Sequence, residues 1–187
     1  VLHWPQVNSS CELYMLMQRD VDRLFPRKGF TALEALADLA DNPEVVNRVG
    51  NSILEWFQKG RRARRSRIVA LASFLPELNQ HFESHDPDAP GSKAVRALKG
   101  LIQFGACLRD KGHPIFTIEI VCGSLMDGIW LGRDKDGITF VANRRPLEVA
   151  FEDLIENLGR VADDATSGGV RLALELEPGP LFLLNNW

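Results

Sequence analysis

Short apolar runs alternate with amphipathic segments from residue 66 onward, and this alternation constrains the fold more than any other feature. Residues 68–74, 115–122 and 170–177 are runs of strand length. The segments between them, 92–109 and 146–161, carry apolar residues at helical spacing. Apolar strands joined by helices are typical of parallel sheets whose faces are covered. The pattern therefore predicts β-α-β units with right-handed crossovers.

The last of these runs carries two carboxylates near its end. Apolar and polar residues alternate through it, so Glu175 and Glu177 share one face with the small Ala173. Residues 178–180, Pro-Gly-Pro, then end the strand. The C-terminal ends of barrel strands are where catalytic groups and metal ligands lie. The alternative is an exposed edge strand with two solvated acids.

Composition narrows the class of protein. The length of 187 residues fits one domain, and the net charge of −3 argues against nucleic acid or an anionic membrane as partner. No apolar run is long enough to span a bilayer. The three cysteines form no C-x-x-C pair, which argues against a disulfide framework or a structural zinc site and for a cytoplasmic protein.

Residues 1–65 are predicted to be a helical N-terminal region, and 66–187 a separate β/α unit. Thr31 and Glu34 have the spacing of a capping box, and apolar residues at helical spacing follow. The Asn-Pro pair at 42–43 then breaks this helix and starts another.

The overall prediction is an α/β fold, a partial (β/α) TIM barrel with parallel strands behind the helical region. About three strand units are present, too few to close a barrel. No strand is followed by a G-x-G-x-x-G or phosphate-loop motif, which argues against a doubly wound nucleotide-binding fold. The first residue is not Met, and the last, Trp187, follows an apolar stretch. We therefore expect a C-terminally truncated fragment, whose open sheet edges promote self-association, including homo-oligomers.

Three segments also resemble a known family in their order. Residues 169–175 (GVRLALE), 68–79 and 117–124 (TIEIVCGS), with the helix from Ser92 between the last two, resemble the xylose isomerase-like TIM-barrel superfamily. This superfamily contains sugar phosphate isomerases and epimerases of carbohydrate metabolism. The resemblance covers roughly residues 66–184.

The resemblance implies a metal-dependent enzyme acting on a sugar or sugar phosphate. Members hold a divalent ion, Mn²⁺, Mg²⁺, Co²⁺ or Zn²⁺, with a Glu, an Asp, a His and a second Glu from successive strand ends. The two Glu pass a proton between neighbouring carbons through a metal-stabilised enediolate. Only the first ligand maps here, onto Glu175, which is also the implied catalytic residue. Glu177 is the alternative ligand or a substrate-binding partner.

Other candidate residues follow the first two strands. His81 and His85 lie in the loop after 68–74 and are candidates for substrate contact, predicted for His81, or for metal binding, against the alternative of solvated loop histidines. Ser124 is a candidate ligand for a sugar hydroxyl, or only part of a turn. Glu119 lies mid-strand, and the sequence leaves open whether it faces the barrel interior or the helices. Cys122 lacks a nearby His and is a weak candidate nucleophile.

Two further function classes remain open. One is a metal-dependent DNA repair enzyme of the endonuclease IV type, which the basic run 59–67 favours. The acidic net charge and the small number of histidines, four, oppose it. The other is a non-catalytic barrel relative that acts as a binding module.

Overall fold

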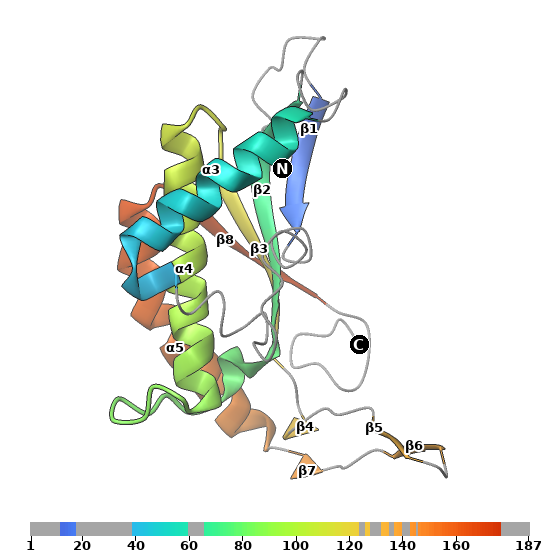
Figure 1. The fold of residues 1–187 in the computed structure, drawn as a ribbon. Helices are drawn as coiled ribbons and strands as arrows, with labels where there is room; N and C mark the ends of the chain where they lie inside the picture. The colour runs from blue at the N-terminus through green and yellow to red at the C-terminus, as the bar shows by residue number, and fades with distance from the viewer. Residues whose placement is uncertain are drawn as a thin grey trace.

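The computed structural model has a parallel sheet with helices packed on one face (Figure 1). The sheet order is β1-β2-β3-β8, and each neighbouring pair is parallel. The strands are β1 (Glu12–Met17), β2 (Ser66–Leu75), β3 (Thr117–Cys122) and β8 (Arg171–Glu175). The structure describes residues 12–17, 39–59, 66–123, 126–127, 132–134, 137–139, 143–144 and 146–176.

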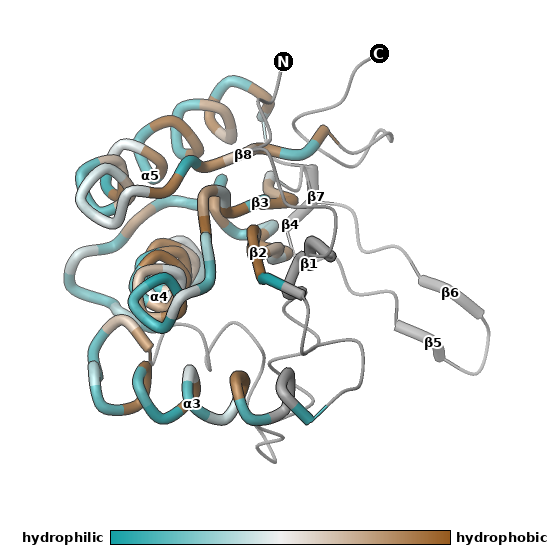
Figure 2. The backbone as a smooth tube through the Cα atoms, turned by 90° about the horizontal axis from the view of Figure 1, so that it is seen from above, coloured by the Kyte–Doolittle hydropathy of each residue, from teal (hydrophilic) through white to brown (hydrophobic). Residues whose placement is uncertain are grey.

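In the described part of the chain, the sheet is accompanied by helices α3 (Pro43–Lys59), α4 (Pro90–Asp110) and α5 (Leu147–Ser167). Helix α4 connects β2 to β3, and α5 lies between β3 and β8 in the chain. The prediction of three parallel strands with two intervening helices is therefore confirmed. Since strand order follows chain order and the helices lie on one face (Figure 2), the sheet is wound in one direction, as in β/α barrels.

Strand β1 corrects the prediction of a purely helical N-terminal region. Its six residues pair with β2, from Glu12 opposite Ser66 to Met17 opposite Ala72. Residues 13–17, Leu-Tyr-Met-Leu-Met, form a short apolar run that periodicity alone does not assign to strand or helix. Pairing with a strand about fifty residues away decides the outcome. The proposed division of the chain at residue 66 stays a prediction.

Local signals set the helix starts. Asn42 caps α3, because its Oδ1 accepts the backbone N–H groups of Glu44 and Val45 at 3.1 and 3.3 Å. Helix α4 begins at Pro90, two residues before the predicted start at Ser92. The Ser92 hydroxyl instead binds the backbone of Glu83 in the preceding loop.

The segment between β3 and α5 contains two short antiparallel pairs. These are β4 (Met126–Asp127) with β7 (Asn143–Arg144), and β5 (Gly132–Asp134) with β6 (Gly137–Thr139). Within the described part of the chain, none of the helices has the length and apolar character needed to cross a bilayer.

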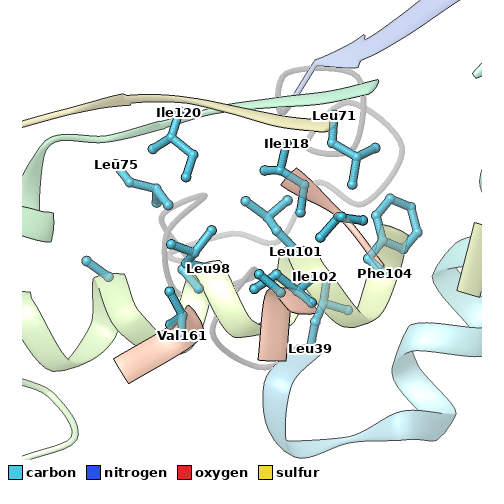
Figure 3. Close-up of a cluster of buried hydrophobic side chains, with 14 of the residues drawn as sticks. Leu39, Leu71, Leu75, Leu98, Leu101, Ile102, Phe104, Ile118, Ile120 and Val161 are labelled. Carbon is cyan, nitrogen blue, oxygen red and sulfur yellow. The ribbon is translucent and has the colours of Figure 1, made fainter. Parts of the chain in front are cut away.

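The hydrophobic core lies between the sheet and α4 (Figure 3). Ile118 and Ile120 of β3 point toward Leu98 and Leu101 of α4, and each is at most 3% exposed. Burial of each such side chain contributes roughly 1.5–3 kcal/mol. This core fixes which face of each strand meets the helices. Other buried members are Leu71, Leu75, Ile102, Phe104 and Val161.

The start of β8 is tied to the end of α4. Arg109 donates from Nη1 to the carbonyl oxygen of Gly169 at 2.9 Å, and its Nη2 binds the Gly168 carbonyl. Gly169 has φ +62°, and a Cβ there would lie 2.9 Å from Arg109 Nη1. The left-handed backbone therefore favours glycine, and an added Cβ would also force the Arg109 guanidinium to shift.

Candidate functional site

The sheet has two chemically different faces. Along β3, Ile118, Ile120 and Cys122 are buried against the helices, whereas Thr117, Glu119 and Val121 alternate with them and are partly exposed. We call the face that these last three share the inner face. The strand register extends it to Ala70, Ala72 and Phe74 of β2 and to Arg171, Ala173 and Glu175 of β8.

Glu119 and Glu175 lie on this inner face, on neighbouring strands. Glu175 is the last residue of β8 and pairs with Val121, while Glu119 pairs with Ala173. The two carboxylates are therefore diagonal neighbours, offset by two residues along the strands. The structure thus decides what the sequence left open for Glu119, which faces away from the helices. Its flanking partners in the sheet are the small Ala72 and Ala173.

Glu175 is accessible at the C-terminal edge of the sheet, and its side chain is exposed. Phe74, which shares its row across β3, is 50% exposed. In parallel β/α folds ligands bind at this edge, because the strand ends and following loops converge there. The edge can therefore present a carboxylate beside an apolar surface to a ligand.

His81 lies at the same edge, in the loop that follows β2. A 3-10 helix, η2 (Pro76–Asn79), carries the chain from Leu75 to this loop. The His81 side chain is 69% exposed, and its Nδ1 lies 3.4 Å from Oδ1 of Asp153, which is 11% exposed. This distance is longer than a normal hydrogen bond, so Asp153 orients the ring only weakly.

A strip of three polar residues on α5 holds this loop in place. Asp153 contacts His81, and Arg160 lies 4.2 Å over the ring of Phe82. Asn157 is 1% exposed and donates from Nδ2 to the carbonyl oxygens of Leu78 and Gln80, at 2.8 and 2.7 Å.

Sequence reasoning missed these loop contacts. Their only signal is a set of polar residues spaced four and three apart along a helix, at 153, 157 and 160. The other end of the loop is held by Ser92.

Burial raises the pKa of two groups near this edge. It raises the pKa of the Cys122 thiol to about 11. It also raises the pKa of the Glu77 carboxyl, and a backbone hydrogen bond at Glu77 has a smaller, opposing effect. Cys122 is therefore protonated at neutral pH and serves as a core residue, because the nucleophile is the thiolate.

Two predicted site residues, Ser124 and Glu177, lie outside the described residues. His85 is exposed in a turn of the loop. Most of the basic run 59–67 is also outside the described part. Nowhere among the described side chains do three or more His, Cys, Asp or Glu gather closely enough to hold a metal ion. The structure therefore brings together Glu119 and Glu175, with His81 two strands away at the same edge.

The fold and this edge define a class: a parallel β/α protein wound in one direction, with the architecture of part of a β/α barrel. No protein-family model matches the chain, and no curated protein matches it. Among solved structures, a crystal structure of the IOLI protein with a bound zinc atom is similar, at TM-score 0.48 and 18% identity. The match covers 93% of this chain and 45% of the other, so this chain spans less than half the length of that protein.

Proposed function

We propose that the inner face, at the C-terminal ends of the strands, is the substrate face of a metal-dependent sugar or sugar-phosphate isomerase or epimerase. The observation that carries the proposal is the pair Glu119 and Glu175, on neighbouring strands and on the same face. Moving a proton between adjacent carbons of a sugar needs a carboxylate or similar base beside the carbon chain. The resemblance of residues 169–175 to a metal-ligand strand of such enzymes adds independent support.

The roles follow from position. Glu175, exposed at the strand end, is proposed as a metal ligand and as a proton acceptor. Glu177 is a substrate-binding partner or an alternative ligand. His81, mostly exposed at the same edge, and Ser124 are proposed to bind sugar hydroxyl or phosphate groups. The residues paired with Glu119 in the sheet, Ala72 and Ala173, both have small side chains.

The described residues fit a divalent ion in donor type but not in number. Carboxylate oxygens suit Mg²⁺ and Mn²⁺, yet Glu119 and Glu175 alone are fewer than such an ion requires. When bound, a metal would supply stabilisation of negative charge on the sugar oxygens. We therefore assign Glu175 as one ligand, and the remaining ligands must come from residues other than those described.

The test is proton exchange into sugars in D₂O, followed by NMR. The chain is incubated with Mn²⁺ and a panel of aldose and ketose phosphates, and loss of the proton next to the carbonyl is measured. We expect exchange that needs the metal and that Glu175→Gln reduces by at least about 100-fold, the order of a lost general base. Glu152→Gln, which removes an exposed carboxylate on α5, should leave it unchanged.

Metal binding gives a second readout that does not need the correct sugar. A calorimetric titration with Mn²⁺ should show saturable binding that weakens on the order of 10-fold in Glu175→Gln and not in Glu152→Gln. Equal binding by both variants, together with no exchange on any sugar, would refute the proposal.

A further inference from the structure

Strand β8 has a backbone edge that faces away from the rest of the sheet. Among the described strands, β8 pairs only with β3. The Arg171 N–H donates to the Phe116 carbonyl at 2.9 Å, so residues 171, 173 and 175 direct their backbone groups toward β3. Leu172 and Leu174 therefore direct their N–H and C=O groups to the outer edge. Such an edge is a template for a further strand.

We propose that this edge pairs with the same edge of a second copy of the chain, as an antiparallel, twofold-symmetric dimer centred on Ala173. The sequence of β8, Arg-Leu-Ala-Leu-Glu, is complementary to itself in this arrangement. Arg171 lies opposite Glu175 of the second copy, and Glu175 lies opposite Arg171. A symmetric interface of this kind uses the same patch on both copies and closes on itself.

Hydrogen bonding and charge select one register. Leu172 lies opposite Leu174 of the second copy, and both direct backbone groups outward, so the pair exchanges two hydrogen bonds. By symmetry the interface contains two such pairs. A slip of one residue would set an outward-directed residue opposite an inward-directed one and lose these bonds. Among larger slips, the one that sets Arg171 opposite Glu177 needs a residue beyond the end of β8 at Glu175, and the slip in the other direction sets Arg171 opposite Ala173 and leaves it without an acidic partner.

Helix α5 adds an apolar stripe beside this edge. Leu147, Phe151 and Ile155 recur every four residues and are 49%, 42% and 59% exposed. The side of α5 that meets α4 is marked by the Lys99–Asp164 ion pair at 3.0 Å. At about 100° per residue, the stripe lies on the side of α5 away from that pair.

The same twofold operation would bring the two stripes together over the paired strands. Figure 2 shows α5 at one end of the helix layer, on the far side of α4 from α3 and beside β8. Leu174, which is 37% exposed and points to the helix side with Ile120, extends the apolar surface onto the strand. A partner for this edge must therefore offer an antiparallel strand whose charges oppose those of β8, together with an apolar helix surface. A second copy of the chain offers both.

The dimer does not rest on the proposed function, because it uses the strand edge and the order of charges. A carboxylate accepts several hydrogen bonds, so Glu175 can accept from Arg171 of the second copy in addition to its other contacts. Dimerisation and metal binding can each fail alone.

Disulfide trapping tests the register. Opposed residues at a non-hydrogen-bonded position have Cα atoms about 4.5 Å apart, within the range that a disulfide spans. We expect Ala173→Cys to cross-link under mild oxidation, with the 173–173 peptide identified by mass spectrometry. Leu172→Cys and Leu174→Cys should not, because their symmetry mates lie beyond roughly 7 Å. Cross-linking at 172 or 174 instead of 173 would overturn the proposed register.

Sedimentation of the whole chain tests the partner and the charges. We expect a monomer–dimer equilibrium that Arg171→Glu or Glu175→Arg weakens by on the order of 10-fold, and that the double exchange restores. Ile155→Ser should weaken it similarly, whereas Val149→Ser, at another exposed apolar site on the opposite side of α5, should not. A monomer at all concentrations, or no restoration by the double exchange, would overturn the proposal.

Discussion

Replacement of Asn157 tests how the loop that carries His81 is held. Asn157 is 1% exposed and donates to the carbonyl oxygens of Leu78 and Gln80 at 2.8 and 2.7 Å. Asn157→Ala leaves two carbonyls without these donors, at about 1–3 kcal/mol each. Alanine regains roughly 0.6 kcal/mol of helix propensity. The substitution also removes the Asn157 Oδ1, which is buried and finds no partner in the described part of the chain. Its removal offsets part of the cost, so the net loss in the free energy of unfolding should be about 2 kcal/mol.

The assay is equilibrium urea unfolding followed by circular dichroism, with Asn51→Ala as the matched control. Asn51 is exposed on α3, so its replacement should change stability by no more than about 0.5 kcal/mol. A loss below about 1 kcal/mol for Asn157→Ala would refute the reasoning, because it would mean that the loop carbonyls find other donors.

A second substitution at the same site gives a signed pH effect. In Asn157→Asp a carboxylate would face the two carbonyl oxygens, which favours the protonated form and raises the pKa of the new carboxyl in the folded state. Because the folded state then binds more protons than the unfolded state, this variant should gain stability as the pH falls toward about 4. It should be less stable than Asn157→Ala at neutral pH, which the same unfolding assay measures.

Three further predictions concern other parts of the fold. Burial, and then the charge of Arg67, lower the pKa of His113, whose Nδ1 accepts a backbone N–H at 3.0 Å. The stabilisation from neutral His113 should therefore be full above about pH 6.5 and decline as the pH falls below that value. Urea unfolding midpoints should show this pH dependence, and His113→Gln should flatten it. Gly169→Ala should lower the free energy of unfolding by about 1–3 kcal/mol, measured by thermal unfolding. Gly112→Ala, also at positive φ but with no atom within 4 Å of an added Cβ, should lower it less. Equal losses would contradict a role of crowding at Gly169. Phe104→Ala, fully buried, should cost about 3–5 kcal/mol in urea unfolding, and a much smaller loss would contradict its place in the core.

The amino-acid sequence by itself determined the β-α-β order of residues 66–176. Periodicity is a local property, so runs such as 115–122 and helices such as 92–109 could be read from neighbouring residues. The parallel sheet follows because each pair of strands is joined by a helix. The helix break at Asn42 and the end of α4 near Gly112, which has φ +91°, are likewise local.

Only the tertiary structure decided the features that depend on distant residues. Strand β1 exists because a long strand, β2, offers it an edge, and a short apolar run carries no local sign of this. Glu119 faces away from the helices because its neighbours Ile118 and Ile120 are buried against α4. The alternation in β3 establishes that the side chain of Glu119 points to the opposite face from those of its neighbours. It does not establish which of the two faces meets the helices.

The candidate site shows the same division. The sequence alone marked Glu175 as a carboxylate near a strand end. It also marked His81 as a residue of a loop that follows a strand. It could not show that Asn157, almost eighty residues from Leu78, supports that loop, because the contact arises only when α5 packs beside η2. Local periodicity determines the elements, whereas packing between them determines which side chains share a face, because burial depends on the whole fold.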